Sequence, residues 1–345
     1  MKKRKIEILD CTLRDGGLGL EDASLNDLSN LNFSTDDINK ILELLRLSKI
    51  DIIELGSIEI SDFDKSKFSV YQNIESVSKL IRDDNSKNQQ FAALYRGPDT
   101  PIIEIPDWNE SLCKYVRVII RYSELKKSLD FCAELSKKGY SVCVQPMVTM
   151  RYTDDEIQLL IDYANSMKAY ALYIVDSYGY MQSNDLKLIF NRFDAGLDSS
   201  VAIGFHGHNN MNLAFSNVLA LLNFDSNRDL IIDTTLLGMG QGAGNLQTEL
   251  FAYYLISSYG ALYNYGAILD AIEIIEKFTS TNLWGYSVTN LLPAVYKTAY
   301  KYSITLRNHF GLSYSEINKL LSDMPEEYRH RYTFENAKKL VNGEV

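Results

Sequence analysis

Eight short segments of the chain are nearly continuous in apolar residues, which is typical of parallel strands that are buried on both faces. Segments with helical periodicity lie between most of them. The predicted strands are 6–13, 51–57, 90–96, 115–121, 141–148, 170–177, 201–208 and 230–238. This alternation predicts an α/β fold of the (β/α)8 TIM-barrel type. A doubly wound sheet would need fewer strands and a GxGxxG loop after the first one, where the sequence has none.

The helix boundaries support this alternation. Ser34 with Asp37 resembles an N-terminal cap, and Thr153 with Glu156 has the spacing of a capping box, each followed by apolar residues at helical intervals. The exception is the segment 97–114, in which three prolines leave little room for a helix.

The final part of the chain falls outside the eight repeats. Its capping residues and helical periodicity predict a mostly helical extension. We therefore expect a barrel domain over residues 1–275 and a helical C-terminal extension over residues 276–345.

The composition of the chain excludes several classes of protein. Among 345 residues, 35 Lys and Arg stand against 45 Asp and Glu, giving a net charge of −10. Such a surface repels nucleic acid and anionic membranes, and no apolar run reaches the roughly 18 residues of a membrane span. Acidic residues interrupt the apolar run that follows the basic N-terminus, unlike in a signal peptide, and the four cysteines show no paired spacing. We expect a cytoplasmic protein.

Candidate chemistry lies at the C-terminal ends of the predicted strands, where such barrels place their active sites. In "IGFHGHNN" (203–210), His206 and His208 are two residues apart and share one face of a strand. Two imidazoles there suit a divalent cation, and Asp15 in "LRDGG" is the carboxylate that we expect to complete the ligand set. The alternative is two structural histidines with no metal.

Other polar residues at strand ends have two interpretations each. Glu54, Arg96 and Arg121 either contact substrate or form ordinary ion pairs, and we expect Glu54 and Arg121 to bind substrate. The glycine-rich loop "GMGQGAGN" (238–245) opens a helix whose backbone N–H groups could hold a carboxylate or phosphate. Glycine loops also make ordinary tight turns.

Three motifs in this order resemble a known family. "LRDGG", "HGHNN" and "GMGQGAGN", the last followed by a helix containing Glu249, are similar to the DRE-TIM metallolyase (HMGL-like) superfamily of TIM barrels. That superfamily includes 4-hydroxy-2-oxovalerate aldolases, isopropylmalate and homocitrate synthases, and hydroxymethylglutaryl-CoA lyases. The chain looks most like the aldolases, because the synthases typically read HxHND and the CoA-dependent lyases carry a cysteine in the glycine loop.

The resemblance implies residue roles. Asp15, His206 and His208 would bind Mn²⁺ or Mg²⁺, with Asn245 as a fourth ligand or a neighbouring support. Arg14 would stabilise an enolate oxygen, and Ser177 in "DSYG" would hold the substrate carboxylate. Many members of the family are oligomers, so a homo-oligomer is also expected.

One position departs from the family. Leu18 stands about where the aldolases have a basic histidine and other relatives a tyrosine, and leucine cannot transfer a proton. Tyr178, Tyr286 or a metal-bound water are the remaining candidates for the base. His309 and His330 lie in the extension, where "YRHRY" is typical of a solvated helix face.

The resemblance predicts a metal-dependent carbon–carbon lyase. Such an enzyme would cleave or form a 4-hydroxy-2-oxo acid through a metal-stabilised, pyruvate-type enolate, with an aldehyde as the second product. Two alternatives remain open. They are a Claisen-type acyltransferase that condenses an acyl-CoA with a 2-oxo acid, and a barrel that binds metal and oxo acid without catalysis. An Fe(II) oxygenase with the same ligand triad is disfavoured, because those enzymes usually have other folds.

Overall fold

The computed structural model describes residues 4–22, 32–59, 69–81, 89–279 and 284–345. Eight parallel strands form a closed barrel, because β1 pairs with both β2 and β9. A two-residue strand, β3 (Val70–Tyr71), pairs with the end of β2. The (β/α)8 prediction is confirmed. The barrel strands are β1 Ile6–Asp10, β2 Ile52–Ile58, β4 Gln90–Tyr95, β5 Tyr115–Ile120, β6 Ser141–Pro146, β7 Ala171–Asp176, β8 Ala202–Gly207 and β9 Leu230–Thr234.

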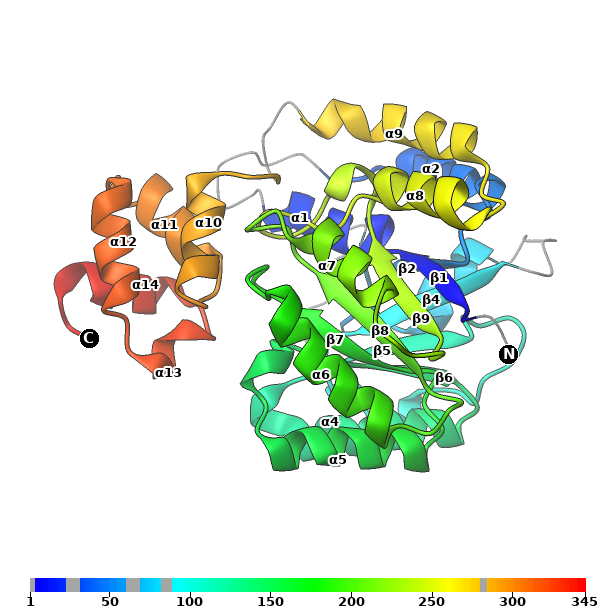
Figure 1. The fold of residues 1–345 in the computed structure, drawn as a ribbon. Coiled ribbons are helices and arrows are strands. Elements are labelled where there is room, and N and C mark those ends of the chain that lie inside the picture. The colour runs from blue at the N-terminus through cyan, green and yellow to red at the C-terminus, as the bar shows by residue number, and fades with distance from the viewer. Residues whose placement is uncertain (1–3, 23–31, 60–68, 82–88, 280–283) are drawn as a thin grey trace.

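Helices surround the barrel, with α4, α5 and α6 on one side and α2, α8 and α9 on the other (Figure 1). Both predicted capping boxes are present, at Ser34–Asp37 and Thr153–Glu156. The segment 97–114 holds a single 3₁₀ turn, Ile102–Glu104, as its prolines predict. The helices are α1 Gly17–Asp22, α2 Thr35–Leu47, α3 Ile74–Ser78, α4 Leu125–Lys137, α5 Asp154–Ser166, α6 Ser183–Gly196, α7 Ala214–Leu222, α8 Thr248–Tyr259 and α9 Tyr265–Thr279.

The apolar core has two layers. The larger one lies between the strands and the surrounding helices. The smaller one fills the barrel interior with residues such as Leu9, Ile52 and Tyr173. Because side chains alternate between the two faces of a strand, the same interior also receives charged residues, including Glu54, Arg117 and Asp233, which are fully or almost fully buried. This polar interior supports the candidate site.

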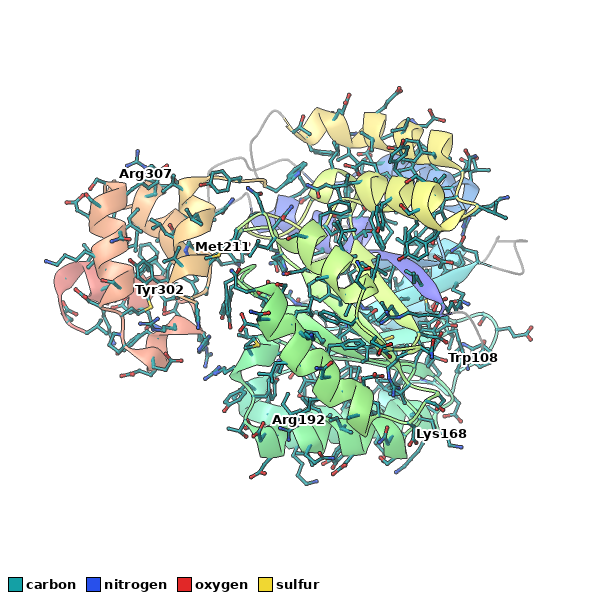
Figure 2. All side chains as sticks on the ribbon, viewed as in Figure 1. Trp108, Lys168, Arg192, Met211, Tyr302 and Arg307 are labelled. Carbon is teal, nitrogen blue, oxygen red and sulfur yellow. The ribbon has the colours of Figure 1, made fainter. Side chains whose placement is uncertain are left out.

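The C-terminal extension is helical, as expected, and has its own core (Figure 2). Tyr302 is completely buried in that core. The extension docks on loops that follow the barrel strands, where Nε1 of Trp284 donates to the carbonyl of Leu237 (2.9 Å). Its helices are α10 Val288–Val295, α11 Lys301–Asn308, α12 Tyr314–Ser322, α13 Glu326–Arg329 and α14 Phe334–Asn342. In the described part of the chain no helix is long and apolar enough to cross a membrane.

Candidate metal centre and active site

The first element of the site is a π-helical turn, Thr12–Gly16, that follows β1. Such turns are rare and often occur at functional sites. This one places Arg14 and Asp15 inside the mouth of the barrel, where both are buried. Nη1 of Arg14 contacts Oδ1 of Asp15 at 2.6 Å, and Nε of Arg14 donates to Glu54 at 2.8 Å. Glu54 therefore fixes the arginine beside the aspartate.

The second element is the pair of histidines at the end of β8. The Nε2 atoms of His206 and His208 are 3.3 Å apart. With Asp15 they form a buried group whose potential ligand atoms all lie within 4.8 Å of one another. The structure thus brings Asp15 next to two histidines that lie about 190 residues later in the chain, as the sequence led us to expect.

The hydrogen-bond partners of the two Nδ1 atoms determine which tautomer each ring adopts. Nδ1 of His206 lies 2.8 Å from a carboxylate oxygen of Asp233, and Nδ1 of His208 lies 3.2 Å from the carbonyl of Gln241. Because an ionised carboxylate and a carbonyl only accept, both Nδ1 atoms carry the proton. In the neutral form of such a ring the lone pair is on Nε2 and is directed into the site, as in histidine ligands that a carboxylate or carbonyl orients.

These residues fit a divalent cation. Two facing nitrogens without protons repel each other unless a positive charge lies between them, and a carboxylate completes the donor set. Asn245 donates through Nδ2 to Asp15, and its own Oδ1 is buried without a hydrogen-bond partner among the described residues. That oxygen is chemically suited to a cation.

The electrostatics of the group favour the forms that bind metal. Burial alone would raise the pKa of Asp15, but Arg14 and the two histidines lower it to about 2. Burial and the neighbouring His206 lower the pKa of His208 to about 4. Near neutral pH the aspartate is therefore ionised and the His208 ring is neutral, which is the state that metal ligation requires.

A buried ion-pair network supports the site from inside the barrel. Arg117 on β5 contacts Glu54 at 2.8 Å and also pairs with Asp233. Arg117 holds the pKa of Asp233 below its ordinary value despite burial. Through Glu54 the network orients Arg14, and through Asp233 it orients His206.

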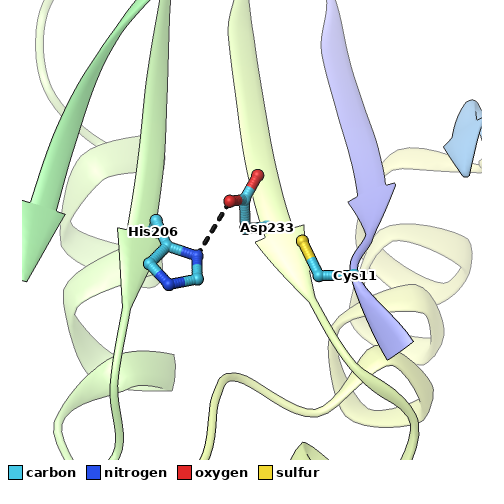
Figure 3. A group of neighbouring side chains, drawn as sticks. All are labelled: Cys11, His206 and Asp233. Carbon is cyan, nitrogen blue, oxygen red and sulfur yellow. Dashed lines mark hydrogen bonds and ion pairs between the residues drawn. The ribbon is translucent and has the colours of Figure 1, made fainter. Parts of the chain in front are cut away.

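A second group of neighbouring donor atoms, Cys11, His206 and Asp233, shares His206 with the site (Figure 3). Burial raises the pKa of the Cys11 thiol well above its ordinary value, so the thiol stays protonated. Nη1 of Arg117 is 3.2 Å from its sulfur. A guanidinium already neutralises this group, so Asp15, His206 and His208 fit a cation better.

A cavity of about 250 Å³ opens over Asp15, His206 and His208. Barrel residues and three residues of the extension, Ala299, Tyr300 and Lys301, line it together. Its wall is mostly apolar apart from Arg14, Lys301, the ligand group and a few hydroxyl and amide groups. The lining residues are Arg14, Asp15, Leu94, Ile119, Gln145, Met147, Val175, Ser177, Tyr178, His206, His208, Gln241, Ala299, Tyr300 and Lys301.

The glycine-rich loop has a structural role that differs from anion binding. The carbonyl of Gln241 accepts from His208, and the backbone of Asn245 bonds to Gly238. A Cβ atom on Gly240 would lie 2.2 Å from Nδ2 of Asn245 and 2.7 Å from Oδ2 of Asp15. The loop therefore packs against the ligand group and orients it. The start of the following helix is not among the residues described around the cavity.

Not every residue that we expected at the site lies there. Arg121 follows the end of β5 and forms ion pairs with Asp99 and Glu124, and Arg96 pairs with Glu59. Neither arginine is among the described residues that line the cavity. For both, the ion-pair interpretation matches the structure.

Two further expected residues lie away from the cavity wall. Tyr286 is 58% exposed, and Glu54 is fully buried behind Arg14. Leu18 is buried as well and is not one of the described lining residues. Ser177 and Tyr178 do line the cavity, directly after β7. Oγ of Ser177 accepts from the backbone N–H of Val148 at 2.9 Å, which fixes its position.

Arg117 and Asp233, two residues of the buried network, were not among the predicted site residues. Arg117 and Asp233 each interrupt an otherwise apolar strand, in "YVRVIIR" and "LIIDTT". An isolated charge in a strand that is buried on both faces must find a buried partner, and this signal could have identified both. His330 was predicted on a solvated face, yet its side chain is 14% exposed and contacts Tyr178.

Together these features define a class, a (β/α)8 barrel with two histidines and an aspartate clustered at the C-terminal ends of its strands. The family model described as HMGL-like matches residues 5–273, and the chain belongs to this family, within the DRE-TIM metallolyase superfamily.

Known relatives agree with this assignment. Over 242 residues the chain is 26% identical to an oxaloacetate decarboxylase of Mycobacterium tuberculosis, covering 70% of this chain and 67% of the relative. It is 28% identical to a 4-hydroxy-2-oxovalerate aldolase of Carboxydothermus hydrogenoformans over 263 residues, covering 73% and 71%.

Solved structures show the same fold. The N-terminal domain of a candidate aldolase from Bacteroides vulgatus aligns with a TM-score of 0.74 at 21% identity, covering 91% of this chain and 99% of that one. A hydroxymethylglutaryl-CoA lyase from Pseudomonas aeruginosa aligns with a TM-score of 0.61 at 16% identity, covering 81% and 93%.

Proposed function

We propose that the chain is a divalent-metal-dependent carbon–carbon lyase that acts on a short 2-oxo acid through a pyruvate-type enolate. The observation that carries this proposal is the geometry of the two histidines, whose Nε2 atoms face each other beside Asp15. The names of the relatives, an aldolase and a decarboxylase of 2-oxo acids, support the reaction class.

Asp15, His206 and His208 would hold Mn²⁺ or Mg²⁺, with Asn245 beside them. When bound, such a cation supplies a Lewis acid for the keto and carboxylate oxygens of the substrate. Arg14, oriented by Glu54 and facing the cavity, donates hydrogen bonds to the oxygen that becomes negatively charged in the enolate.

The remaining lining residues orient a small substrate. The Ser177 hydroxyl keeps its proton for a carboxylate, because its oxygen accepts from Val148. The apolar wall, which includes Leu94, Ile119 and Val175, excludes water from the reacting carbons. The cavity is smaller than the roughly 300–1,000 Å³ of drug-sized pockets, so we propose short-chain 2-oxo acids with an aldehyde as the second product.

Turnover of the Mn²⁺-loaded protein tests the proposal. Pyruvate release is measured on a panel of 4-hydroxy-2-oxo acids and on oxaloacetate. We expect release from at least one of them, together with loss of bound metal and of turnover in Asp15→Ala. Asp36→Ala is the matched control, because Asp36 is an exposed aspartate that pairs with Lys40.

Two results would contradict the proposal. If the metal binds and no substrate releases pyruvate, the barrel binds an oxo acid without cleaving it. If thiol appears when acetyl-CoA is supplied with 2-oxo acids, the chain is a Claisen-type acyltransferase.

A further inference from the structure

A histidine of the extension, His330, contacts a residue of the active-site cavity wall from behind. Tyr178 lines the cavity at the end of β7, and its hydroxyl lies 3.2 Å from Nδ1 of His330. The two rings are nearly parallel, with an interplanar angle of 9° and centroids 5.9 Å apart. One hydrogen bond thus joins a residue of the barrel to a residue of the extension.

A carboxylate orients this histidine. Nε2 of His330 lies 3.0 Å from Oε1 of Glu326, one helical turn earlier in the chain. Because the carboxylate only accepts, Nε2 carries the ring proton and Nδ1 accepts from the Tyr178 hydroxyl. Glu326, His330 and Tyr178 therefore form a chain of hydrogen bonds that leads into the cavity.

Three other titratable side chains of the cavity wall belong to the candidate metal site. His206 and His208 have both ring nitrogens engaged, by their outer partners and by the cation site. Asp15 is ion-paired with Arg14 and belongs to the same site. Tyr178 is the lining residue whose hydroxyl reaches a histidine outside the ligand group.

We propose that Glu326, His330 and Tyr178 form a proton relay, in which the extension supplies the histidine that receives the proton of a barrel tyrosine. The relay rests on the proposed function and specifies its proton-transfer step. Tyr178 is the catalytic residue, and His330 and Glu326 act through it.

The step balances without an external reactant. In cleavage of a 4-hydroxy-2-oxo acid, the Tyr178 oxygen takes the proton of the C4 hydroxyl and passes its own proton to Nδ1 of His330. The C3–C4 bond breaks, the aldehyde forms, and the electron pair of that bond becomes the enolate. The same proton then returns through Tyr178 to C3 and gives the methyl group of pyruvate.

The surroundings of His330 favour the neutral ring that this step needs. Burial is the largest cause that lowers the pKa of His330, and Glu326 opposes the shift. Burial also raises the pKa of Tyr178, so the phenol keeps its proton until a partner accepts it. Besides Tyr178, the charged and titratable groups around the ring are Arg151, Tyr180, Asp185, Lys297, Glu326 and Arg329.

Kinetics of the Mn²⁺-loaded full chain test the relay. We expect Tyr178→Phe and His330→Gln each to lower kcat about 100-fold, with little change in KM, because general acid–base groups contribute at least this factor. Glu326→Gln should give a smaller loss. The acidic limb of the kcat pH profile should disappear in His330→Gln, and added imidazole should restore activity to His330→Ala.

Glu327→Gln is the matched control, because Glu327 is an exposed neighbour on the same helix. Turnover by His330→Gln at half the wild-type rate or more would overturn the relay while leaving the proposed function intact. Wild-type protein that neither releases pyruvate nor exchanges the methyl protons of pyruvate in D₂O would overturn both.

A measurement without substrate tests the contact itself. The ring-proton NMR signal of His330, identified by its loss in His330→Gln, is followed against pH. Tyr178→Phe should change its midpoint, since that variant removes the donor to Nδ1. An unchanged midpoint would overturn the relay whatever the activity.

Discussion

Arg117 and Asp233 form an ion pair in the closed interior of the barrel, and the same carboxylate oxygen of Asp233 contacts Nδ1 of His206 at 2.8 Å. The arginine has no solvent exposure, and the aspartate is almost as deeply buried. The positive charge of Arg117 keeps Asp233 ionised. The ionised Asp233 in turn fixes the tautomer of His206, a predicted metal ligand. This relationship couples the stability of the barrel to the state of its active site.

The first prediction concerns this pair. Arg117→Met leaves the buried Asp233 without a guanidinium partner and Glu54 with Arg14 alone. We expect it to lower the free energy of unfolding by about 3 to 5 kcal/mol. Urea denaturation measures the loss. Arg121→Met is the control, since its half-exposed ion pairs should be worth no more than about 1 kcal/mol.

If Arg117→Met fails to fold, neutralising its partners tests the same cause. Adding Glu54→Gln and Asp233→Asn should recover much of the lost stability, because no uncompensated charge then stays buried. A triple variant no more stable than Arg117→Met would contradict the electrostatic explanation.

The second prediction concerns the contact between Gly240 and the ligand group. In Gly240→Ala the new methyl group would collide with Asn245 and Asp15. We expect Mn²⁺ affinity, measured by calorimetric titration, to fall about 10- to 100-fold, as when residues that orient metal ligands are changed. Gly260→Ala also places alanine at a positive φ, but nothing lies within 4 Å of its Cβ. Equal affinity loss in both variants would show that backbone strain, not the collision, is responsible.

The third prediction concerns the pH dependence of stability in metal-free protein. The pKa of His208 is about 4 in the folded chain and about 6.5 when unfolded. Between these values the unfolded state binds a proton that the folded state does not, so stability falls as the pH is lowered through this window. The total loss from this residue is about 3 kcal/mol.

His208→Gln should remove most of that slope between pH 6.5 and 4. His309→Gln, which changes an exposed histidine of the extension, should retain it. Asp15 acts in a lower window, because its folded pKa of about 2 adds stability that is lost as the pH falls from about 4 towards 2. Urea midpoints across the pH range check both windows, and identical slopes for the two histidine variants would refute the assignment.

The fourth prediction concerns the last residue of "HGHNN". Nδ2 of Asn210 donates to the carbonyl of Asn290 in α10 at 2.7 Å. In Asn210→Asp two buried oxygens would face each other, which costs about 1 to 3 kcal/mol. We expect the extension to become more sensitive to limited proteolysis while the barrel stays folded.

Asn209→Asp is the matched control for this change. The Asn209 side chain accepts from the backbone N–H of Ala214, and aspartate keeps that acceptor. Equal cleavage of the two variants would show that the Asn210 contact does not hold the extension in place.

Some of the site could be predicted from local sequence, because strand and helix periods act over a few residues. His206 and His208 occupy alternate positions of a strand and therefore share a face. The capping pair at Thr153 and Glu156 likewise needs only a spacing of three. The meeting of Asp15 with the histidines was expected from the family resemblance and from the rule that strand ends of a barrel converge.

Arg117 and Arg121 show where the local pattern is insufficient. Both belong to the same predicted strand and are four residues apart, so their spacing places them on one face. The strand ends at Ile120, however, and the chain then turns, which directs Arg121 to Asp99 and leaves Arg117 inside. Which arginine reached the interior depended on where the strand stopped.

By itself the sequence determined the order of strands and helices, the shared face of the two histidines and the family. These features depend on spacings of two to four residues and on short motifs. Only the tertiary structure decided which buried charges pair, which ring nitrogens keep their protons and that His330 reaches Tyr178. Those contacts join residues up to 152 positions apart, and they exist only once the barrel has closed and the extension has docked.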